Sequence, residues 1–276
     1  MAKNNELDML NGALLPKILM FSLPLALTGI LQLLFNAADV IVVGKFAGST
    51  SLAAVGATSA LVNLLTGAFI GISVGVNILV ARYAGCRDDA RVERAVHSAI
   101  ALSLVLGVVT FLLGFFLSTP MLEWMDTPDD VLALASLYLR IYFIGIPGAL
   151  IYNFAAAILR AYGDTKRPLI FLAISGVLNV FLNLFFVIVC ELDVAGVAIA
   201  TVVSQYVAVV LILICLVRQE GPAKLKLREI RLHPDEALRM IQIGLPAGLQ
   251  SVVFNISNVM VQSCVNSFGA DVIAAN

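Results

Sequence analysis

The chain has 276 residues, of which 61% are hydrophobic and 13% charged, and its formal net charge is -1. Soluble domains average about 45–50% apolar and about 25% charged residues, so this composition argues against a soluble enzyme. A soluble fold of this size would have too thin a polar shell to cover so much apolar surface. The charge also argues against a nucleic-acid partner, because no basic excess is present to neutralise phosphates. We therefore expect a lipid bilayer to surround most of the chain.

Seven apolar stretches are long enough to cross a bilayer, since about 20 apolar residues span about 30 Å of hydrocarbon as a helix. They are apolar on all sides, which favours helices over the alternating strands of a membrane barrel. The expected fold class is an all-α polytopic membrane protein. The predicted spans are Leu15–Val43, Leu52–Val80, Val96–Leu117, Val131–Ala157, Pro168–Cys190, Val194–Val217 and Ala237–Cys264.

The first span carries an acid inside the hydrocarbon. The polar segment before it lacks a signal-peptide pattern, so we expect this span to be an uncleaved anchor. Asp39 lies about six residues, or roughly 9 Å, before the outer end of the span. A charge in the hydrocarbon costs about 2.5–3.5 kcal/mol on insertion scales, which makes Asp39 a functional candidate.

The second, third and fourth spans offer fewer signals. Gly67, Gly71 and Gly75 form a double GxxxG pattern in the second span, which is typical of close helix packing. Arg140, in the fourth span, either reaches outward or pairs with an acid. The four cysteines form no CxxC pair, and we assign no metal site to His97 or His233.

Oxygen-bearing side chains occur at matching depth in the fifth and sixth spans. Asn179 and Asn183 are four residues apart and share one helix face. Thr201 lies about seven residues into the sixth span, which brings it near the depth of Asn183 and Asp39. Such oxygens suit a hard cation such as Na⁺, whereas a carboxyl in a low dielectric can carry a proton instead. We predict a shared cation site, the alternative being that the amides and the hydroxyl only join helices by hydrogen bonds.

Basic residues gather in the segments 82–94, 160–167 and 218–239, while the other loops are acidic or neutral. By the positive-inside rule, the N-terminus and the linker near 218–236 are expected in the cytoplasm. The basic part of this linker either contacts anionic lipid headgroups or is a plain solvated loop.

The last span carries an uncharged polar stripe and begins an apparent repeat of the first. The stripe predicts either a wet cavity or an interface between lobes, and consists of Ser251, Asn255, Asn258, Gln262 and Asn266. The repeat pairs Ser22–Pro24 with Gly244–Pro246, Phe35–Val40 with Phe254–Val259, and Leu52–Ala54 with Ile273–Ala275. A six-span unit gives parallel repeats. We expect a truncated chain with an N-lobe at 1–217, a cytoplasmic linker at 218–236 and the start of a second lobe at 237–276.

Several stretches resemble the multidrug and toxic compound extrusion (MATE) family over the whole chain. They are SLPLALTGILQLLFNAADVIVVGKFAGSTSLAAVG, ILRAYGDTKRPL, GVLNVFLNLFFV and GVAIATVVSQ. The resemblance implies a twelve-helix fold of two six-helix lobes in the plasma (inner) membrane. It implies export of lipophilic cationic small molecules in exchange for H⁺ or Na⁺, with no other cofactor and with both lobes required.

By motif position, the family's N-lobe cation site falls on Asp39, Asn179, Asn183 and Thr201. One branch of the family has Asp where this chain has Asn183, and another has a Glu in helix 7 that is absent here, so the coupling ion stays open between H⁺ and Na⁺. A substrate cavity is predicted to include Asn36, Asn153, Asn255, Asn258 and Gln262.

Two other functions remain as alternatives. A lipid-linked oligosaccharide flippase of the same superfamily should carry more cations facing its cavity, whereas Arg140 is the sole intramembrane cation here. A seven-helix receptor or channel with a cytoplasmic N-terminus would have the reverse of the usual receptor orientation. An enzyme is not expected, because no nucleophile–base pair is visible.

Overall fold

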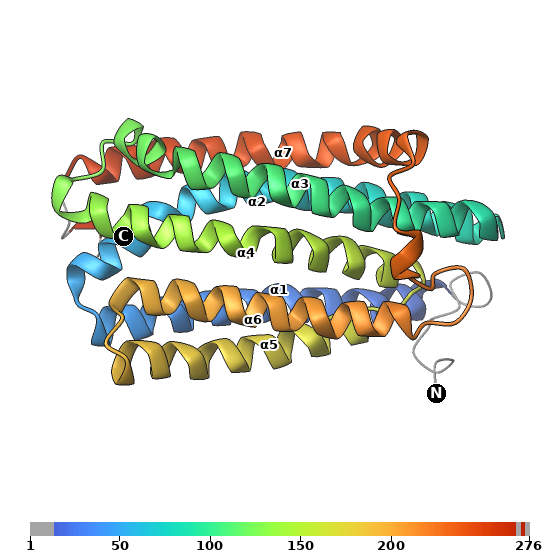
Figure 1. The fold of residues 1–276 in the computed structure, drawn as a ribbon, viewed down its shortest axis with the longest axis horizontal. Helices are drawn as coiled ribbons and strands as arrows, with labels where there is room; N and C mark the ends of the chain where they lie inside the picture. Colours follow the sequence, from blue (N-terminus) through green and yellow to red (C-terminus); the bar gives the residue numbers. More distant parts are fainter. Residues whose placement is uncertain (1–13, 269–271, 274–276) are drawn as a thin grey trace.

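A computed structural model describes residues 14–268 and 272–273 of the chain. Within these residues, long helices lie side by side along the long axis of the molecule (Figure 1). They are α1 Leu14–Phe46, α2 Ser49–Gly85, α3 Asp89–Trp124, α4 Asp129–Ala161, α5 Lys166–Leu184, α6 Asp193–Val217 and α7 Pro234–Asn266. A short π-helix, η1, covers Phe185–Val189, and a 3₁₀ turn, η2, covers Leu227–Glu229 in the linker.

All seven α-helices of the described residues are long and apolar enough to cross a membrane, which confirms the predicted fold class. The helices run beyond the predicted spans at most ends. For example, α3 has 36 residues and starts seven residues before the predicted Val96. At about 1.5 Å per residue it is about 54 Å long, more than the roughly 40–45 Å of a bilayer with its headgroups. A cap supports its extended start, because the Asp88 side chain accepts a hydrogen bond from the Arg91 backbone N–H.

The fifth span departs from a regular helix near its C-terminal end. The predicted span Pro168–Cys190 corresponds to one helix long and apolar enough to cross a membrane, Lys166–Val189, within which the α-helix changes to η1 at Phe185. There the Cys190 N–H donates to the Phe185 carbonyl at 3.1 Å, a five-residue spacing. The wider turn places Phe186 against Gly196 of α6, where an added Cβ would lie 3.0 Å from the Phe186 Cβ. Apolar periodicity could not predict this local change.

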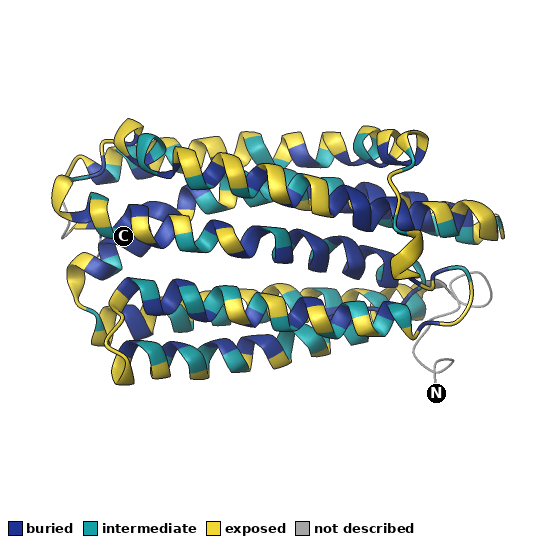
Figure 2. Ribbon diagram, viewed as in Figure 1, coloured by how far each residue is buried: buried dark blue, intermediate teal, exposed yellow. Residues whose placement is uncertain are grey.

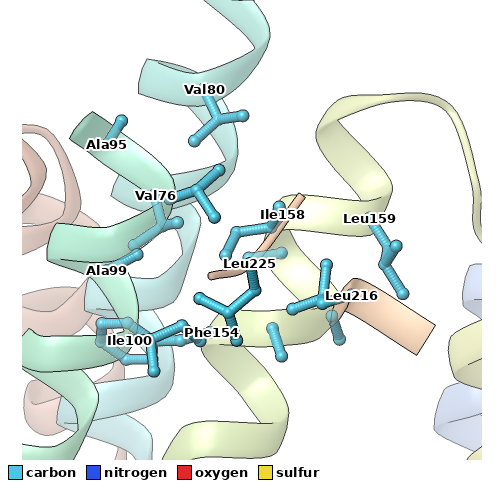
Figure 3. Close-up of a cluster of buried hydrophobic side chains, with 14 of the residues drawn as sticks. Val76, Val80, Ala95, Ala99, Ile100, Phe154, Ile158, Leu159, Leu216 and Leu225 are labelled. Atoms are coloured by element: carbon cyan, nitrogen blue, oxygen red, sulfur yellow. The ribbon is translucent and has the colours of Figure 1, made fainter. Parts of the chain in front are cut away.

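Helix α4 is the centre of the bundle. Two thirds (67%) of its most apolar stretch is buried, against 6% for α1, and Figure 2 shows α4 as the most continuously buried ribbon in this view. It packs against α2, α3 and α6. In Figure 3, Phe154 and Ile158 of α4 meet apolar side chains from several elements. These are Val76 and Val80 of α2, Ala99 and Ile100 of α3, Leu216 of α6 and Leu225 of the linker.

Helix α7 packs on α2, on the face that carries the glycine pattern. A Cβ added to Gly71 would lie 2.3 Å from the Gly248 Cα, and one added to Gly75 would lie 2.1 Å from the Met240 carbonyl oxygen. The predicted close packing is therefore present, and its partner is α7. The N-terminal segment 1–13 and the repeat match at 274–275 lie outside the described residues. The division into lobes and linker stays a prediction.

Candidate functional site

The residues of the predicted cation site lie together and form one row of hydrogen bonds across three helices. Asn183 on α5 donates from Nδ2 to Asp39 Oδ1 on α1 and to Asn179 Oδ1, the latter at 3.2 Å. Asn179 Nδ2 in turn donates to Thr201 Oγ1 on α6 at 3.3 Å. The Thr201 hydroxyl donates to the Val197 carbonyl at 3.0 Å. The depth estimate therefore selected side chains that do meet.

A close approach of α1 to α5 brings Asp39 to this row. Gly176 on α5 has no side chain, and an added Cβ would lie 1.9 Å from the Phe35 ring of α1. Phe35 precedes Asp39 by one helical turn, and Asn179 and Asn183 follow Gly176 by about one and two turns. The small residue thus sets the helix separation at which the carboxylate and the amides can bond.

The row has a spare oxygen that faces no donor. Asn183 is fully buried, and its Oδ1 has no hydrogen-bond partner among the described residues. A buried acceptor without a donor is energetically unfavourable. A cation or a proton-donating group bound beside Asn183 Oδ1 would supply the missing partner. The described residues contain no cluster of three His, Cys, Asp or Glu side chains suited to a metal ion. The donor set therefore fits a hard monovalent cation or a proton at Asp39 better than a transition metal.

A polar cavity of about 280 Å³ borders the row. Its walls come from α1, α2, α4, α5 and α6, and they include Asp39, Asn179 and Thr201. The predicted cavity residues Asn36 and Asn153 also lie in the wall. Among the described residues that line it, Asp39 is the one charged side chain.

Sequence reasoning missed several polar residues of this cavity. They are Gln32, Asn63, Thr66, Ser175, Ser204 and Gln205. Gln205 could have been found, because it lies one turn after Thr201 and so shares its helix face. Asn63 and Thr66 of α2 gave no comparable signal in the sequence. Which side of α2 faces the cavity depends on how this helix packs against α4.

The predicted cavity residues of α7 do not reach this cavity. Asn255 lies against α2, where an added Cβ at Gly67 would be 3.0 Å from Asn255 Nδ2. Gln262 Nε2 donates to Asn266 Oδ1 at 3.0 Å, and Asn266 Nδ2 donates to the Met125 carbonyl of the α3–α4 turn at 3.0 Å. Asn258 is exposed. The stripe therefore serves mainly as an interface with α2 and α3, because α7 docks on the side of the bundle opposite α5 (Figure 1).

Arg140 pairs with hydroxyls and with no acid of the described chain. Its Nε donates to Ser118 Oγ at 3.3 Å and its NH2 group to Thr119 Oγ1 at 3.1 Å. Its guanidinium carbon also lies 6.0 Å from the centre of the Phe115 ring. The side chain is thus held on α3 near the end of the bundle that carries the α3–α4 turn, away from the cavity.

Comparison with known proteins places these features in a family. The family model described as MatE matches residues 24–185, more than half of the chain. The chain is 31% identical over 269 residues to the "Probable multidrug resistance protein YpnP" of Bacillus subtilis, covering 97% of this chain and 60% of that protein. It is 22% identical to the "Multidrug export protein MepA" of Staphylococcus saprophyticus, covering 92% of this chain and 56% of that protein.

The fold agrees with a solved member of the same family. A crystal structure of MATE in the bent conformation superposes with a TM-score of 0.82 at 26% identity, covering 94% of this chain and 58% of that one. The chain thus spans less than two thirds of the length of the relatives that it matches.

Proposed function

Because the chain belongs to the MatE family, we propose that it forms the first lobe and seventh helix of a secondary active multidrug exporter. The longer protein would export lipophilic cationic small molecules in exchange for H⁺ or Na⁺. A second lobe, for which the relatives' greater length leaves room, would be required for transport. The observation that carries the proposal is the hydrogen-bonded row from Asp39 to Thr201 beside the polar cavity.

Cation loading at Asp39 would change how α1 packs against α5. In the structure, Asn183 Nδ2 donates to the Asp39 carboxylate and joins the two helices. A proton or Na⁺ on this carboxylate competes with that amide for the same oxygen, so loading and the α1–α5 contact are coupled. A ligand shifts a conformational equilibrium only by its differential affinity for the two states. Drug and coupling ion, sharing Asp39 at one cavity, would exclude each other and produce antiport.

The chemistry of the cavity supports a cationic substrate. Asp39 is the one charge in the described lining, and Tyr142, Tyr152 and Phe35 supply aromatic surface. Aromatic faces and a carboxylate both attract organic cations. An anionic lipid-linked sugar would need cations in the wall, so the flippase alternative gains no support here.

The distribution of charge supports an inner-membrane orientation with the N-terminus in the cytoplasm. The start of α1, the α2–α3 turn and the α6–α7 linker lie at one end of the bundle (Figure 1). This end carries Arg82, Arg94, Arg228 and Arg231, whereas the α3–α4 turn at the other end is acidic. The positive-inside rule assigns the basic end to the cytoplasm.

The test is drug efflux by the longer protein carrying Asp39→Asn, with Asp126→Asn in the α3–α4 turn as a control of equal chemistry. We expect Asp39→Asn to abolish gradient-driven export and Asp126→Asn to leave it intact. Dissipating the Na⁺ or the proton gradient separately would identify the coupling ion. Export that continues undiminished in the Asp39 variant would refute the proposal.

A further inference from the structure

The linker between α6 and α7 is folded against α3 and held at two points. Leu225 is fully buried in the core beside α4. Next to it, the Lys226 backbone N–H donates to His97 Nε2 at 3.1 Å. At the far end, the His233 backbone N–H donates to Ser98 Oγ at 3.1 Å. The segment 226–233 is therefore a bridge fixed to one face of α3 at both ends.

A basic pocket of about 480 Å³ lies between this bridge and the first turns of α3. Its charged lining residues are Glu93, Arg94, Arg228, Glu229 and Arg231. A neighbouring lysine, Lys226, bridges the two acids and offsets one of their two negative charges. Lys226 Nζ lies 2.5 Å from Glu93 Oε1 and 3.2 Å from Glu229 Oε2. Both hydrogen bonds raise the pKa of Lys226, and the bond to Glu93 has the larger effect.

The three arginines of the pocket are left without acidic partners. None of their guanidinium groups makes an ion pair or a hydrogen bond with the described part of the chain. All three side chains are exposed. Guanidinium groups present a rigid fork of donors that matches phosphate oxygens. The pocket thus has surplus positive charge and donor groups of the kind that bind phosphate.

Apolar side chains flank the arginines on the bridge. Leu227 and Leu232 are 61% and 45% exposed, and they adjoin Arg228 and Arg231 in the chain. Exposed leucines beside arginines are typical of segments that lie at the membrane surface, where the apolar groups enter the acyl region and the cations meet headgroups. A soluble anion would use the arginines and leave the leucines exposed to water.

The pocket lies at headgroup depth. The predicted hydrocarbon segments of α3 and α7 begin at Val96 and Ala237, so the pocket is within about two helical turns of both. The basic end of the bundle is also the one that we propose faces the cytoplasm. Basic pockets between helices on this side can bind the headgroups of anionic lipids.

We propose that the pocket between α3 and residues 226–233 binds the phosphate of an anionic phospholipid of the cytoplasmic leaflet. Arg94, Arg228 and Arg231 hold the phosphodiester, and Leu227 and Leu232 contact the acyl chains. One lipid would then join α3 of the first lobe to the segment that leads into α7. This site is separate from the transport cavity, and its occupancy is measurable without transport.

The test is native mass spectrometry of the purified chain in detergent, titrated with phosphatidylglycerol or with phosphatidylcholine. We expect one phosphatidylglycerol to bind at least tenfold more tightly than phosphatidylcholine. An arginine near an anionic headgroup contributes about 1 kcal/mol, so replacing all three arginines by glutamine is expected to remove the preference, a loss on the order of 100-fold. The matched control is the triple variant Lys166→Gln/Arg218→Gln/Lys224→Gln, which removes the same amount of charge outside the pocket. This variant should keep the preference for phosphatidylglycerol.

Further variants separate the sources of the phosphate and guard against misfolding. The double variant Leu227→Ser/Leu232→Ser should weaken binding of both lipids. Inorganic phosphate in roughly 10-fold molar excess over the lipid, enough to reveal simple competition for the pocket, should not displace phosphatidylglycerol. The linker variant Arg228→Gln/Arg231→Gln, with helical circular dichroism unchanged, should already reduce the preference. Three results would overturn the proposal: equal binding of both lipids, equal losses in the pocket and control variants, or displacement by inorganic phosphate.

Discussion

The close packing of α2 on α7 makes Gly71→Ala a quantitative test of the fold. A Cβ at this position would lie 2.3 Å from both the Cα and the backbone N of Gly248, whereas ordinary contacts begin at 3.4 Å. Backbone atoms cannot rotate away as a side chain does, so the two helices must separate by about 1 Å at this point. A gap of about 0.5–1 Å forfeits a quarter to a half of the dispersion energy of each affected contact. Overpacking of this kind costs about 1–3 kcal/mol.

The matched control is Gly29→Ala on α1, where no atom lies within 4 Å of the added Cβ. Both substitutions gain the higher helix propensity of alanine, about 0.8–1.0 kcal/mol in water. The difference between them therefore isolates the cost of the α2–α7 contact.

Unfolding in mixed micelles with increasing SDS, followed by circular dichroism, measures both variants against the parent chain. We expect Gly71→Ala to be about 1–3 kcal/mol less stable than Gly29→Ala. Hydrogen exchange should show the loosening first in α7. Equal stability of the two variants, with unchanged exchange in α7, would refute the reasoning and place α7 elsewhere.

Three further predictions concern the core, the α2–α7 link and the site. Phe154→Ala should cost about 3–5 kcal/mol in the same SDS unfolding assay, because this fully buried ring fills the centre of the bundle; a cost below about 1 kcal/mol would contradict its central position. Tyr83→Phe removes a hydroxyl that donates to Glu236 on α7 at 2.8 Å, and it should cost about 1–2 kcal/mol. In a double-mutant cycle it should be non-additive with Glu236→Gln, and full additivity would mean that the two groups do not interact. Asn183→Leu should abolish efflux by the longer protein while Asn183→Asp retains it, and equal efflux by both would exclude Asn183 from the site.

Much of the candidate site could be predicted from the sequence because depth in a membrane follows from position along a helix. Each residue advances about 1.5 Å, so Asp39, Asn183 and Thr201 could be assigned to one level from their distances to the span ends. Asn179 joined them through its spacing of one turn from Asn183. Asn63 and Thr66 were missed because depth alone does not say which way a helix faces, whereas Gln205 shares the helix face of Thr201 and could have been found.

Residue type and spacing along the chain were enough to predict the seven spans, the depth of the polar residues and the basic end of the bundle. Which helix faces meet became visible in the fold: Gly71 lies against Gly248, Asn255 faces α2 and Arg140 bonds to hydroxyls. The physical reason is that lipid is as apolar as leucine. Apolar patterning therefore does not distinguish a buried face from a lipid-facing one, and close approach at small residues and hydrogen bonds between helices decide the arrangement.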